Sequence, residues 1–148
     1  MTSSIVHATA VFFPQEQGSV LIRGPSGSGK SDLAFRLIEQ GAQLVSDDQV
    51  ALFNRRDKIY VEAIESIRGL LEVRGLGLLH YPPAMMSELL LVVDLVPRDD
   101  VPRLPEWEKT VLLNVALPLL HLHAFDASTA YKLRKATAII RNPEMIVT

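Results

Sequence analysis

The stretch Gly24-Pro25-Ser26-Gly27-Ser28-Gly29-Lys30-Ser31 decides the fold of this 148-residue chain. It matches the pattern G-x-x-x-x-G-K-S in full. Its glycines let backbone N–H groups converge on an anion without a Cβ atom in the way. Lys30 is expected to reach the terminal phosphates, and the Ser31 hydroxyl is a suitable ligand for Mg²⁺. The stretch therefore predicts a site for a nucleoside triphosphate or polyphosphate.

The segments on either side of this loop have the expected character for an α/β protein. Residues 19–23 read as a strand that leads into the loop, and residues 30–40 read as a helix ended by Gly41. Residues 42–47 form the next predicted strand. A strand before such a loop and a helix after it place the amides at a helix N-terminus, which favours anions.

The rest of the chain mixes hairpins with helices, which favours a mixed sheet over a regular βαβ array. We expect one domain over residues 1–148, with a glycine-punctuated loop at 67–77 and a polar, proline-marked loop at 97–108. The other predicted strands are 5–13, 50–53, 58–63, 88–96, 110–115 and 117–124, and a closing helix is predicted at 128–141.

Composition excludes several classes of protein. The chain is 48% hydrophobic and 22% charged, with a net charge of −2, so the charge balance carries no sign of nucleic-acid binding. Its longest apolar run, near residues 89–93, is far too short to span a membrane. It contains no cysteine, which excludes disulfides and fits a reducing cytoplasm.

Two adjacent acids, Asp47 and Asp48, end the strand that follows the predicted helix. In α/β sheets ligands bind at such strand ends, which places these acids beside the phosphate loop. Neighbouring side chains on a strand point to opposite faces, so the two cannot play one identical role. One can act on a hydroxyl proton while the other holds it in place or contacts metal. Alternatively, Asp48 only starts the next turn.

A second charged segment carries Glu72 and Arg74 two residues apart, followed by Gly75 and Gly77. That spacing puts both charges on one face of an extended chain. Glu72 could complete a Mg²⁺ site and Arg74 could hold a phosphate. From spacing alone, a salt-bridged loop is the favoured interpretation.

The loop, the Asp47-Asp48 pair and the segment Glu72-Val73-Arg74-Gly75-Leu76-Gly77 together resemble HPr kinase/phosphorylase, in a short form made of the catalytic domain. The resemblance runs from about His7 to the closing helix. It implies a nucleotide-binding domain like that of phosphoenolpyruvate carboxykinase and assembly into a hexamer. It also implies ATP- and Mg²⁺-dependent phosphorylation of a serine on the phosphocarrier protein HPr, in regulation of the phosphotransferase system.

The resemblance also assigns roles to individual residues. Asp47 resembles the base that takes the serine proton, Asp48 its support, and His7 the histidine on the first strand near these acids. Lys30 belongs to the catalytic set, and Arg103 matches the arginine on the mobile loop.

Ser31 and Glu72 resemble the metal ligands, and Arg74 is expected to contact the nucleotide phosphates. The resemblance further implies the reverse reaction, in which inorganic phosphate attacks phosphoserine. The family's basic loop before the final helices corresponds here to residues 116–121, which contain no arginine or lysine. The sequence therefore argues less strongly for the reverse reaction, since phosphate sites favour guanidinium groups.

Two other functions remain open on the residues alone. A kinase or hydrolase could use the same loop and acids on a small molecule. A nucleotide-sensing module without catalysis would need the loop but not Asp47.

Overall fold

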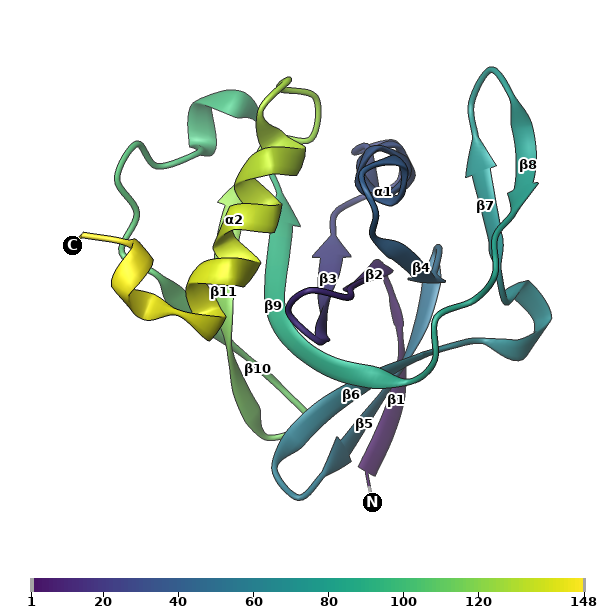
Figure 1. Ribbon diagram of the computed structural model, residues 1–148, viewed down its shortest axis with the longest axis horizontal. Coiled ribbons are helices and arrows are strands. Elements are labelled where there is room, and N and C mark those ends of the chain that lie inside the picture. The colour runs from purple at the N-terminus through teal and green to yellow at the C-terminus, as the bar shows by residue number, and fades with distance from the viewer. Residues whose placement is uncertain (1, 148) are drawn as a thin grey trace.

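The computed structural model describes residues 2–147, and Figure 1 shows them as a twisted sheet with two helices against one face. The helices are α1 (Lys30–Glu39) and α2 (Thr129–Arg141), with short 3₁₀ turns at Glu65–Ile67, Arg98–Asp100 and Pro143–Met145. The strands are β1 (Thr2–His7), β2 (Thr9–Phe13), β3 (Gly18–Arg23), β4 (Gln43–Ser46), β5 (Gln49–Arg55), β6 (Lys58–Ala63), β7 (Leu70–Val73), β8 (Gly77–His80), β9 (Ser87–Leu95), β10 (Glu108–Leu112) and β11 (Val115–Leu122).

The main sheet is mixed, as the sequence predicts. Its strand order is β1-β5-β6-β9-β3-β2-β4, and β11 pairs with β9 and with β10. Strands β3, β9 and β11 run parallel to one another, while the other pairings are antiparallel (Figure 1). The carboxyl ends of the three parallel strands therefore meet at one edge of the sheet.

Apolar side chains alternate between the two faces of the sheet and fill two cores. On β3, Val20 and Ile22 join the core beneath α1 and α2, whereas Leu21 joins the core on the opposite face. Helix α1 buries Leu33 and Leu37 completely in the first of these cores. Burying a leucine side chain is worth about 1.5–3 kcal/mol, so this stripe fixes the helix, and with it the loop at its N-terminus.

Two predicted elements are wrong. The single strand at 5–13 is two strands, because the chain breaks at Ala8: β1 pairs with β5, whereas β2 pairs with β3 and β4. The glycine-punctuated loop at 67–77 is largely a hairpin, since β7 pairs with β8 and positive φ angles at Gly75 and Gly77 allow the tight reversal.

Candidate active site

The glycine-rich loop follows β3 and runs into the first turn of α1. Gly27 and Gly29 adopt φ angles of 80° and 102°, which residues other than glycine rarely adopt. The Ser28 amide donates to the Pro25 carbonyl at 3.0 Å, and the Leu33 amide donates to the Gly29 carbonyl at 2.9 Å. The first turn of a helix leaves its own N–H groups without intrahelical acceptors, so this loop presents donors to an anion.

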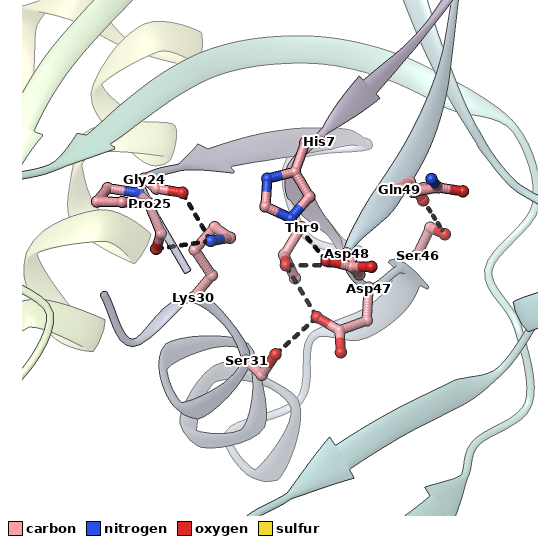
Figure 2. Close-up of polar contacts among 10 residues, drawn as sticks. All are labelled: His7, Thr9, Gly24, Pro25, Lys30, Ser31, Ser46, Asp47, Asp48 and Gln49. Atoms are coloured by element: carbon pink, nitrogen blue, oxygen red, sulfur yellow. Dashed lines mark hydrogen bonds and ion pairs between the residues drawn. The ribbon is translucent and has the colours of Figure 1, made fainter. Parts of the chain in front are cut away.

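Lys30 places a positive charge inside the loop. Its side chain is only 7% exposed, and its Nζ donates to the carbonyls of Gly24 at 2.7 Å and Pro25 at 3.0 Å (Figure 2). Within residues 2–147, no carboxylate forms an ion pair with it. With carbonyl oxygens as its protein partners, the Lys30 ammonium group is available to pair with a phosphate ligand.

Asp47 and Asp48 form a tight bend between β4 and β5. The Gln49 amide donates to the Asp47 carbonyl at 2.8 Å, and Asp48 has a left-handed φ of 69°, a region that aspartate tolerates better than most residues. The bend explains how two adjacent carboxylates reach one site, because neither residue continues the strand.

The two carboxylates have different partners, as Figure 2 shows. Asp47 Oδ1 accepts hydrogen bonds from the hydroxyls of Ser31 at 2.8 Å and Thr9 at 2.9 Å. Asp48 Oδ1 lies 2.7 Å from His7 Nε2, and the Asp48 side chain is 70% exposed. The structure thus joins Asp47 to the phosphate loop and leaves Asp48, with His7, facing solvent.

A cavity of about 550 Å³ connects these groups. Its wall includes the basic residues Lys30 and Arg74 and four carboxylates, those of Asp32, Asp47, Asp48 and Glu72. Glu72 lies on β7 and Arg74 in the turn that follows, and both are exposed. Because a triphosphate is itself strongly anionic, this excess of carboxylates requires a cation before such a ligand can bind.

The donor set fits Mg²⁺ rather than a metal held entirely by protein. Ser31 and Glu72 offer the hard oxygen ligands that Mg²⁺ prefers. Among the described residues, no three His, Cys, Asp or Glu side chains cluster as a metal site would require. Mg²⁺ commonly takes one or two protein ligands and completes its shell with water and substrate phosphates.

Two regions that the resemblance matches to loops of the family do not reach this cavity. Arg103 is exposed on the segment between the 3₁₀ turn Arg98–Asp100 and β10, and it does not line the cavity. Residues 116–121 lie within β11 rather than in a loop. The loop that precedes the closing helix is residues 123–128, which also lack arginine and lysine.

Sequence reasoning missed two residues of the site. Thr9 is fully buried and donates a hydrogen bond to Asp47. A polar threonine between two alanines on an apolar strand is the feature of the sequence that could have marked it. Phe125 lines the cavity from the connection between β11 and α2, and nothing in its local sequence pattern marks it.

The fold resembles that of a solved HPr(Ser) kinase/phosphatase from Coxiella burnetii. The TM-score is 0.80 at 21% sequence identity, and the match covers 96% of this chain and 92% of that chain. This likeness defines the class: a mixed α/β domain with the fold of an HPr kinase structure.

Sequence comparison then identifies the family. The family model described as HPr Serine kinase C-terminal domain matches residues 3–85, which is more than half of the chain, and the chain belongs to this family. Proteins named HPr kinase/phosphorylase are 33% identical over 115 residues in Lactobacillus acidophilus and 39% identical over 110 residues in Neisseria meningitidis. These matches cover 70% and 66% of this chain, but only 36% and 32% of those proteins. The chain therefore spans about a third of the length of these relatives.

Proposed function

We propose that this chain is a protein serine kinase domain that transfers the γ-phosphoryl group of ATP to a serine of HPr, with Mg²⁺. Its family and the names of its relatives support the acceptor. The observation that carries the proposal is the 2.8 Å hydrogen bond from Ser31 to Asp47, because it joins the phosphate loop to a carboxylate that can act on the acceptor.

The loop at residues 24–31 binds the donor as a P-loop, in a domain like that of phosphoenolpyruvate carboxykinase. Loop amides and Lys30 hold the outer phosphates, and Arg74, which lines the same cavity, is a further cation for them. Ser31 and Glu72 would hold Mg²⁺, which when bound neutralises charge on the transferring phosphoryl group.

Asp47 is the base in this proposal. The acceptor serine oxygen attacks the γ-phosphorus, the bond to the ADP oxygen breaks, and the serine proton passes to Asp47. Both hydrogen bonds to Asp47 end on Oδ1, which leaves Oδ2 for the acceptor. Asp48 and His7 support Asp47 in this proposal. Their 2.7 Å contact holds the Asp48 carboxylate beside that of Asp47.

The forward reaction is favoured over phosphorolysis. The connection at residues 123–128 adds no guanidinium or ammonium group to Lys30 and Arg74, and binding of free phosphate beside four carboxylates is favoured by further cationic groups. Arg103 acts in this proposal only if its segment moves toward the acceptor.

The remaining parts of the proposal concern the setting of the domain. We infer a cytoplasmic protein that assembles as a hexamer and regulates the phosphotransferase system through HPr. In residues 2–147, neither helix has the length and apolar character needed to cross a bilayer.

The test is incubation of the protein with γ-labelled ATP, Mg²⁺ and HPr, followed by mapping of the labelled residue. Label on one HPr serine supports the proposal. ATP turnover without HPr, or label on an added small molecule, would instead support the small-molecule kinase or hydrolase.

A further inference from the structure

An aromatic side chain stands at the rim of the phosphate loop. Phe125 lines the cavity, and its ring tip lies so near Gly29 that a Cβ atom added to that glycine would fall 2.8 Å from Cζ of the ring. The side chain is nevertheless 57% exposed. Part of the ring is therefore open at the mouth of the cavity.

The segment that carries Phe125 is anchored on both sides. Arg36 of α1 donates to the carbonyl of Ala124 and, at 3.3 Å, to that of Asp126. Arg98 forms an ion pair with the Asp126 carboxylate at 2.6 Å. Because α1 also begins at the phosphate loop, this anchoring fixes the aromatic ring relative to the phosphate site.

The imidazole of His123 further limits the ring. It packs against Phe125 edge to face, with centroids 5.9 Å apart and an interplanar angle of 74°. His123 is itself held by its Nδ1, which lies 3.0 Å from the Val96 carbonyl oxygen. An aromatic ring that is held in place and half exposed loses little entropy when a flat ligand stacks on it.

The topology puts this ring where the rest of a nucleotide would extend. Parallel strands β3 and β11 end at the same edge of the sheet, the first leading to the phosphate loop and the second to Phe125 (Figure 1). Ligands of open α/β sheets bind across such carboxyl ends. With the phosphates in the loop, the base end of the donor can lie over the β11–α2 connection.

We propose that Phe125 is the stacking surface for the nucleobase of the phosphoryl donor. This inference rests on the proposed function, and it assigns the residue that contacts the base of the nucleotide donor. Every base has an aromatic face, so stacking alone favours a nucleotide over an inorganic polyphosphate and does not require one particular base.

The test compares ATP with tripolyphosphate, which carries the same phosphate chain without a nucleoside, in calorimetric titrations with Mg²⁺. Wild-type protein is expected to bind ATP more tightly. Phe125→Ala should weaken ATP binding on the order of tenfold and leave tripolyphosphate binding unchanged. Phe125→Tyr should retain ATP affinity because it keeps the ring. Tyr131→Ala removes another exposed aromatic, one that does not line the cavity, and should change neither affinity.

Three results would overturn the inference: equal affinity of the wild type for both ligands, unchanged ATP affinity in Phe125→Ala, or equal losses for both ligands in that variant. The last result would mean that Phe125 only supports the loop through Gly29. In each case the wild type still binds a triphosphate, so the assignment of residues 24–31 as the phosphate-binding loop is unaffected. Failure of the wild type to bind either ligand would instead remove the proposed function along with the inference.

Discussion

Replacement of Asp47 by asparagine separates the charge of this side chain from its shape. Asparagine keeps a carbonyl oxygen that can accept the hydrogen bonds from Ser31 and Thr9, but it cannot take a proton. Asp47→Ala removes the acceptor as well. The pair of variants therefore distinguishes proton transfer from support of the bend.

The structure sets the size of each effect. In Asp47→Ala the fully buried Thr9 hydroxyl loses its acceptor, which costs about 1–3 kcal/mol, while the partly exposed Ser31 can turn to water. For a chain of this size that loss lowers Tm by roughly 2–4 °C per kcal/mol. Asp47→Asn should melt closer to the wild type. Loss of a positioned base lowers turnover by about 10²–10⁴-fold in both variants.

The assay is phosphoryl transfer from labelled ATP to HPr, measured beside calorimetric ATP binding and thermal melting. Asp47→Asn is expected to bind ATP at least as tightly as wild type, because one carboxylate fewer faces the phosphates. Asp48→Asn is the matched control, with the same chemical change at the neighbouring position. It should retain more activity, because Asp48 contacts His7 and not the phosphate loop.

Equal turnover of Asp47→Asn and wild type would refute the base role. A larger loss in Asp48→Asn than in Asp47→Asn would transfer that role to Asp48 with His7.

Other predictions concern the loop and its surroundings. Lys30→Ala removes charge-assisted hydrogen bonds worth about 1.5–3 kcal/mol, so calorimetry should show ATP binding weaker by roughly 10- to 150-fold; unchanged affinity would exclude the phosphate role. Gly29→Ala should lower Tm more than Gly75→Ala. Both glycines have positive φ, but only a Cβ atom added at Gly29 meets other atoms, the nearest at 2.7 Å. Equal losses of Tm would mean that backbone strain alone, and not this close packing, sets the effect. The hydrogen bond from Arg98 lowers the pKa of Asp126. This contact therefore stabilises the fold at pH values above the ordinary carboxyl pKa, and the stabilisation is lost as the pH falls through the lowered pKa. In an NMR titration, Arg98→Ala should raise the pKa of Asp126 toward its ordinary value, and no change would mean that the pair does not form in solution.

The parts of the fold that the sequence could predict are those set by local pattern. The glycine-rich loop, α1 and the β5–β6 hairpin lie within a residue or two of their predicted positions, because apolar spacing and turn residues define them. The mixed α/β sheet followed from the same patterns. The resemblance brought Glu72 and Arg74 to the site, and the structure places both on the cavity wall.

The rest depends on pairing between distant segments. Residues 5–13 have uninterrupted strand character, and only the different partners of β1 and β2 show that the chain breaks at Ala8. The left-handed φ of Asp48 is likewise set by the pairing of β4 and β5 with other strands. Phe125 reaches the cavity because β11 lies parallel to β9, a pairing that residue pattern does not encode.

The break at Ala8 places the hydrogen-bond partners of the two acids on two strands that differ in stability. Thr9, which holds Asp47, lies on β2 between two strands and is fully buried, whereas His7 lies on β1, whose side chains are largely exposed and whose place is at the end of the strand order. Edge strands with little buried surface open at lower free energy than central ones. Pairing of another chain with β5 would therefore displace β1 and break the contact between His7 and Asp48. The hydrogen bond between Ser31 and Asp47 would remain.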